Sequence, residues 1–170
     1  MTKLLKQIRI LTIIFIVALV ISGVTAFPVY EELKWITNSN LFAENSALHT
    51  WLMKVWTGIK KTHEDYPFIF YGFDWLAFAH LVIAVLFIGV YRHPVRNRWI
   101  IQWAMISCIG VIPLAFIAGF VRGIPFFHIL IDCSFGVFGL IPLFIIQSKI
   151  KKLAILKKAN RNIAKGKITI

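Results

Sequence analysis

The sequence predicts an all-α polytopic membrane protein, an antiparallel bundle of four transmembrane helices with a short helical segment outside the membrane. Hydrophobic residues fill 59% of the 170 positions and charged residues only 15%, which is too little polar surface to cover a soluble globule of this size. Four apolar stretches are each long enough to cross about 30 Å of hydrocarbon, for which a helix needs roughly 20 residues. These predicted spans are residues 8–27, 70–91, 99–121 and 125–146.

The links between the last three spans are short, which decides how the helices are connected. RHPVRNR separates the second span from the third, and RGI separates the third from the fourth. Consecutive helices must therefore fold back as antiparallel neighbours. We expect a single membrane domain over residues 1–170.

The formal net charge of +12 is concentrated in segments that flank the spans. The basic residues are Lys3, Lys6 and Arg9 before the first span, Arg92, Arg96 and Arg98 after the second, and eight Lys or Arg from Lys149 to Lys167. Residues 28–69 hold five acids against four lysines. Placing every basic segment in the cytoplasm satisfies the positive-inside rule at all spans, so we predict both termini inside and residues 28–69 outside. This topology accounts for the charge, and no Gly-rich phosphate loop or nucleic-acid module is present, so we expect no nucleic-acid partner.

The first span has a second interpretation. Its lysines, its apolar run and the small residues Val24, Thr25 and Ala26 also fit a cleaved signal peptide, which would leave three spans. The apolar run continues through Phe27 and is long for a signal peptide, so we favour a retained anchor. The other spans have the same orientation in both cases.

The predicted outer segment, residues 28–69, is too short to bury a core of its own. Leu48, Leu52, Val55 and Ile59 recur at helical spacing, which predicts an amphipathic helix. This helix either lies in the membrane interface, covers the bundle or binds a partner. A second helical turn is expected over residues 28–37, with Pro28 at its first position.

The basic tail, residues 149–170, interrupts its lysines with Leu153, Ile155 and Leu156. We expect its start to continue as a helix from the fourth span and then to lie along anionic lipid headgroups. Beyond Asn160 a solvated, fraying end is the alternative. Truncation after Lys152 is expected to leave folding intact.

The two cysteines do not indicate thiol chemistry. Cys108 falls near the middle of the third span, and Cys133 lies closer to the outer end of the fourth. A disulfide needs Cα atoms within about 7 Å, which these depths disfavour. We read both as small apolar fillers.

Three strings, YPFIFYGFDWLAFAHLVIA, RHPVRNRW and RGIPFFHILIDCSFGVFG, carry a resemblance. Together they resemble a group of uncharacterised bacterial four-span inner-membrane proteins, over roughly residues 66–142. The resemblance implies location in a bacterial inner (cytoplasmic) membrane. It implies no activity and no functional residues.

Ionisable residues at membrane depth are the candidate site, because such groups are costly in hydrocarbon and mark functional positions by default. The candidates are Asp74, His80, Arg122, His128 and Asp132. Counted from the outer end at about 1.5 Å per residue, they form two levels. Asp74, His128 and Arg122 lie near the outer rim, and His80 with Asp132 lies roughly 10 Å down. We predict that His80 pairs with Asp132.

These residues allow three classes of function. The first is an accessory, assembly or interaction protein, with the polar cluster holding the bundle, a small ligand or another membrane subunit. The second is a redox protein that binds haem b or a quinone through His80 and His128. The third is a proton or small-ion transporter, although the inner half of the bundle offers little besides Gln102 to carry a proton.

An enzyme is not indicated. The chain has no nucleophile turn of the type G-x-S-x-G, so no catalytic residue is assigned. His128 and Asp132, four residues apart, are only two metal ligands, which is too few to predict a metal site.

Overall fold

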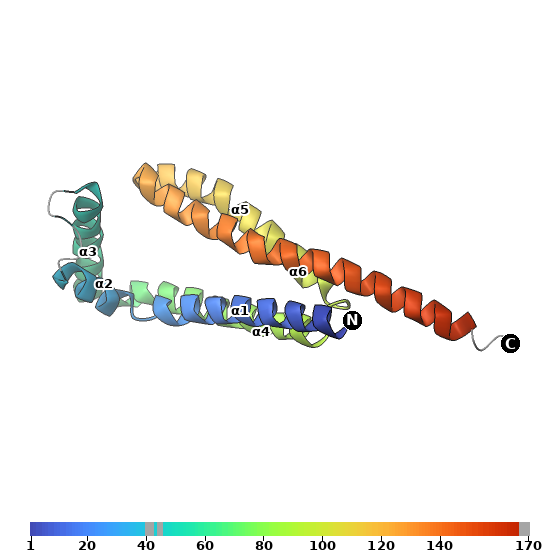
Figure 1. Ribbon diagram of the computed structural model, residues 1–170. Coiled ribbons are helices and arrows are strands. Elements are labelled where there is room, and N and C mark those ends of the chain that lie inside the picture. The colour runs from blue at the N-terminus through green and yellow to red at the C-terminus, as the bar shows by residue number, and fades with distance from the viewer. Residues whose placement is uncertain (40–42, 44–45, 167–170) are drawn as a thin grey trace. The chain divides into compact units, whose positions relative to one another are not determined.

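Every regular element in the described part of the chain is a helix. The computed structural model describes residues 1–39, 43 and 46–166. The elements are α1 (Thr2–Ala26), α2 (Val29–Asn38), α3 (Ala47–Asp65), the short 3-10 helix η1 (Pro67–Phe70), α4 (Tyr71–Arg92), α5 (Arg98–Arg122) and α6 (Phe126–Gly166) (Figure 1). The predicted all-α class is confirmed.

Four of these helices, α1, α4 with η1, α5 and α6, are long and apolar enough to cross a membrane. The chain is therefore a multi-pass membrane protein. The bounds of α4 and α5 differ by one residue from the predicted spans. The largest difference is in α6, which runs on for 41 residues as one uninterrupted helix through most of the basic tail. Asn160 is inside this helix, whose last turns include no helix-breaking proline.

The chain divides into two compact units. Unit 1 consists of residues 1–16 and 85–170, and unit 2 of residues 17–84. Each is described by itself below.

Unit 1 has a core to which all four long helices contribute. Phe15 of α1 packs on Phe87 of α4, with their ring centroids 4.8 Å apart. The fully buried side chains are Ile8, Thr12, Phe87, Val90, Ile100, Ile101, Ile129, Leu143, Ile146, Ile150 and Leu153. Since Leu153 is 1% exposed, the first turns of the predicted tail belong to the core. The tail is therefore part of the fold at least as far as Leu153, which removes the basis for expecting a harmless truncation after Lys152.

The α5–α6 pair is held at close range by glycines. A Cβ atom on Gly136 would lie 2.5 Å from the carbonyl oxygen of Cys108, and one on Gly139 would lie 3.0 Å from the Cys108 sulfur. A Cβ on Gly119 would lie 2.6 Å from the side chain of Ile129. Small residues let helix backbones approach, which is the usual packing device in membranes. These three contacts are called the glycine contact below.

The reversal between α5 and α6 depends on Gly123. Its φ of +66° is left-handed, which glycine adopts without steric cost. The N–H of Ile124 donates to the carbonyl of Gly119 at 2.9 Å, so the turn satisfies a terminal carbonyl of α5. The predicted antiparallel reversal is thus present within unit 1.

The basic segments of unit 1 meet at one end, which we call the basic end. Lys149 of α6 donates to the side-chain oxygen of Gln7 in α1 at 2.8 Å. The side chain of Asn160 lies 3.4 Å from the sulfur of Met1. The start of α1, the turn after α4 and the last part of α6 therefore belong to one end of one unit.

Unit 2 combines the end of α1 and the start of α4 with the two short helices. Helix α3 starts at Ser46, whose hydroxyl accepts from the N–H of His49, and it includes the predicted amphipathic stretch. Tyr30 of α2 stacks on His63 of α3 with ring centroids 4.0 Å apart. Pro28 precedes α2 as its N-cap residue instead of occupying the first helical position.

Candidate functional site

The predicted site residues are divided between the two units. Asp74 and His80 belong to unit 2, whereas Arg122, His128 and Asp132 belong to unit 1. The proposed pair of His80 with Asp132 joins residues of both units, as does the outer level. Both remain predictions, and each half is described separately.

In unit 1, His128 and Asp132 face one another along α6. Nε2 of His128 lies 3.9 Å from a carboxylate oxygen of Asp132, and the two side chains are 39% and 45% exposed. This separation is too long for a hydrogen bond. Arg122 is exposed in the last turn of α5. The glycine contact holds α5 against α6 without involving these three residues.

In unit 2, His80 is fixed by its own helix. Its Nδ1 lies 2.8 Å from the carbonyl oxygen of Leu76, one turn earlier. A carbonyl only accepts hydrogen bonds, so Nδ1 carries the hydrogen in this contact.

The face of α4 that carries His80 packs against α1. A Cβ on Gly23 would lie 3.1 Å from the Cβ of His80 and 2.9 Å from the carbonyl oxygen of Ala77. Only glycine permits this approach without displacing backbone. The Cβ of His80 therefore lies at the contact between α1 and α4 and not on a fully exposed face of α4.

Asp74 has different surroundings from His80. It lines a hollow of about 350 Å³ together with Phe27, Tyr71, Trp75 and Phe78. Six residues separate it from His80, which places the two about 120° apart around a helix. The neighbouring aromatic rings are typical of the level where a membrane meets water.

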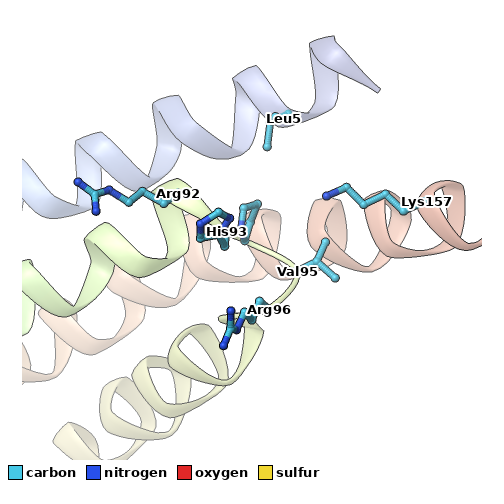
Figure 2. A pocket seen from close by; sticks show the side chains of 7 residues that line it. Leu5, Arg92, His93, Val95, Arg96 and Lys157 are labelled. Atoms are coloured by element: carbon cyan, nitrogen blue, oxygen red, sulfur yellow. The ribbon is translucent and has the colours of Figure 1, made fainter.

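One site was missed in the sequence analysis, where its arginines served only to orient the spans. At the basic end, a hollow of about 320 Å³ is lined by Leu5, residues 92–96 and Lys157. Figure 2 shows Lys157 extending from α6 toward the turn with His93 and Val95, with Leu5 of α1 opposite, while the guanidinium of Arg92 extends away. We call this the basic hollow. The cluster RHPVRNR was its only sequence signal, because Leu5 and Lys157 are distant in the chain.

A second missed feature is a buried amide. Gln147 is 8% exposed, and among the described residues its Oε1 is buried without a hydrogen-bond partner. It follows directly after the last residue of the predicted fourth span. A polar side chain at that position is consistent with the end of a span. The helix instead continues, and Gln147 lies inside it.

Comparisons with known proteins add no family to this description. No protein-family model, no curated protein and no solved structure matches the chain. Function is therefore argued from the residues themselves.

Proposed function

We propose that this chain is an accessory or assembly protein of a bacterial inner membrane, with both termini in the cytoplasm. In this proposal Asp74, His80, Arg122, His128 and Asp132 hold membrane helices of this chain, or of another membrane subunit, or a small ligand.

The observation that carries the proposal is the position of Asp132. Its side chain is 45% exposed on a membrane-spanning helix, beside an α5–α6 contact made by glycines. An ionisable group at membrane depth needs a polar partner or water. Since the glycine contact does not use Asp132, the carboxylate is available for an interaction other than α5–α6 pairing.

His80 supplies a second polar group for the same role. Its Nδ1 is hydrogen-bonded to the carbonyl of Leu76, which leaves Nε2 as the ring nitrogen for a partner. A fixed imidazole loses little side-chain entropy when it binds. These features support a pairing of His80 with Asp132 in the outer half of the spans.

The decisive experiment is a double-mutant cycle measured by thermal unfolding in neutral detergent. If the pair exists, His80→Ala and Asp132→Ala each cost about 1–3 kcal/mol, and the double variant costs clearly less than their sum. His80→Ala with Ser134→Ala is the matched control, because Ser134 bonds to the carbonyl of Ile131 in its own helix. Additive effects in the first cycle would reject the pair.

A redox protein is the second candidate, favoured by the same bond of His80. A haem-ligating histidine commonly donates Nδ1–H to a carbonyl and presents Nε2, as His80 does. The ligand set would be His80 with His128 for haem b, or the same residues as contacts to a quinone. A Soret band in the purified protein, lost on His80→Ala while the fold survives, would replace the accessory proposal with this one.

The topology is tested separately by reporter fusions. We expect a periplasm-dependent reporter to be active when fused near Lys54 and inactive when fused after Lys167. The opposite pattern would overturn the proposed orientation without affecting the pairing test.

A further inference from the structure

The basic hollow lacks a neutralising acid within its own unit. Unit 1 holds fifteen of the nineteen Lys and Arg residues, and its only acid is Asp132. Asp132 and Lys157 are 25 positions apart in α6, about 38 Å along a helix. At that distance the carboxylate is screened from the hollow by any physiological salt. No acidic side chain of unit 1 therefore neutralises the hollow.

The turn that forms one wall of the basic hollow is held in place before any ligand binds. The side-chain amide of Asn97 donates to the carbonyl of Gly89 at 2.7 Å and to that of His93 at 3.2 Å. Pro94 is buried within the same turn. These contacts fix residues 93–97 without using Arg96, whose side chain is exposed. The basic groups are thus available to a ligand, and binding does not require the turn to be ordered first.

A second hollow adjoins the first and is more apolar. It has a volume of about 250 Å³ and shares Leu5 with the basic hollow. The rest of its lining is Thr2, Lys6, Arg9, Ile10, Ile13 and Tyr91. Ile13 lies eight residues after Leu5 in α1, about 12 Å further along the helix axis. We call this the apolar hollow.

The rim of the apolar hollow carries a fixed positive charge. Nε of Arg9 donates to the carbonyl oxygen of Tyr91 at 3.3 Å, and its guanidinium lies 5.3 Å from the centroid of the Tyr91 ring. From Ile10 onward α1 continues as an apolar stretch. An amphiphilic molecule has the same order, with a polar group at one end and an apolar chain beyond it.

We propose that the basic hollow binds the phosphate of an anionic phospholipid, with one acyl chain lying in the apolar hollow beyond Leu5. Arg96 and Lys157 supply the cationic donors, because guanidinium and ammonium groups form strong charge-assisted bonds to phosphate oxygens. Basic pockets between membrane helices at the cytoplasmic side are suited to such headgroups. A lipid is favoured over free phosphate because the two hollows share Leu5 and the lining of the second extends along α1 to Ile10 and Ile13.

The test is a titration of the full chain in neutral detergent with dioctanoyl phosphatidylglycerol, read as the shift in unfolding temperature. We expect a saturable rise, because a ligand that binds only the folded state stabilises it. R96Q/K157Q should weaken the apparent affinity by on the order of tenfold or more. The matched control K158Q/R161Q also removes two positive charges. Both come from the exposed part of α6 that carries Lys157 but do not line the basic hollow, so the affinity should change less than about twofold. If both double variants lost the same amount of affinity, binding would depend only on the overall positive charge of the basic end, and the proposed site would be overturned.

Two further arms separate a lipid from soluble phosphate. Inorganic phosphate and dioctanoyl phosphatidylcholine, at the same concentrations, should give no saturable shift if both the charge and the chain are needed. Ile13→Ala should weaken binding by about threefold, and Ile14→Ala, which changes a neighbouring exposed residue outside the lining, should not. Saturation by inorganic phosphate at the same midpoint would assign the basic hollow to a soluble anion and overturn the lipid. Absence of saturation with phosphatidylglycerol would overturn both.

Discussion

At the basic end of unit 1, large side chains from α1, α4, α5 and α6 are buried together, whereas at the opposite end of the unit α5 and α6 meet through glycine. The first region is represented by Ile8, Phe87, Ile101 and Ile146, all fully buried. In the second region, Gly136 brings the backbones of α5 and α6 into contact. At the basic end Arg9 and Lys149 also hydrogen-bond between helices, whereas Arg96 and Lys157 line the basic hollow.

The difference separates side chains that hold helices together from side chains that line a hollow. Replacing a buried core side chain lowers the stability of the fold. Arg96 and Lys157 line the basic hollow, outside the buried core, so replacing them should change binding more than stability.

The largest effect is expected at the basic end, on shortening Phe87. Phe87→Ala leaves a cavity against Phe15 and should cost about 3 kcal/mol, the lower end for such a change because the unfolded chain remains in an apolar medium. Thermal unfolding in detergent measures the loss. Phe138→Ala is the control, because that ring is 68% exposed and its removal should cost little. Equal losses would mean that the core is not at the basic end.

The glycine contact is tested by adding a side chain to Gly136. Gly136→Leu would place a Cβ 2.5 Å from the Cys108 carbonyl oxygen, so α5 and α6 must separate, at about 2 to 3 kcal/mol. Gly110→Leu adds the same side chain where no atom lies within 4 Å and should leave the unfolding temperature nearly unchanged. If the two variants behaved alike, α5 and α6 would not be in backbone contact.

Two truncations test where the buried core ends along α6. Ending the chain after Lys152 removes the buried Leu153 and should cost about 2 kcal/mol. Ending it after Leu156 keeps Leu153 and should cost less than about 0.5 kcal/mol, since the residues removed are exposed or terminal. The comparison is read from thermal unfolding of both truncated proteins. A harmless deletion after Lys152 would place the end of the core before Leu153.

The smallest effect is expected at the turn beside the basic hollow. Asn97→Ala leaves the carbonyls of Gly89 and His93 without their side-chain donor and should cost about 1 kcal/mol. It should also weaken the binding of phosphatidylglycerol, because the turn is no longer fixed. Asn162→Ala, on the exposed last part of α6, is the control for both measurements. A change in stability without a change in lipid binding would separate the turn from the proposed site.

The membrane helices were predictable because hydropathy and length act locally along the chain. The third predicted span, residues 99–121, is α5 from Arg98 to Arg122. The same holds for α3, whose apolar residues recur at helical spacing. Helix existence and approximate bounds need no knowledge of which helices meet.

What could not be predicted depends on contacts between distant residues. Leu153 follows two lysines and fits an exposed tail, yet it is 1% exposed. The basic hollow joins Leu5, the turn after α4 and Lys157, which no local pattern connects. Periodicity gives the face of a helix, but not the neighbour that this face touches.

The candidate site was predictable as a set of residues and not as a geometry. Asp74, His80 and Asp132 can be chosen from the sequence alone, because an ionisable side chain in hydrocarbon is energetically costly. The bond from His80 to Leu76 was not foreseen, because a histidine rotamer is decided by the space left beside Gly23 and by its own helix.

The length of α6 has a mechanical consequence. At 41 residues the helix is about 60 Å long, twice the thickness of a hydrocarbon core. Asp132 and Lys157 are about seven turns apart and therefore point in nearly the same direction from one rod. Pro142, between them, removes one backbone hydrogen bond and is the point where the rod bends most easily.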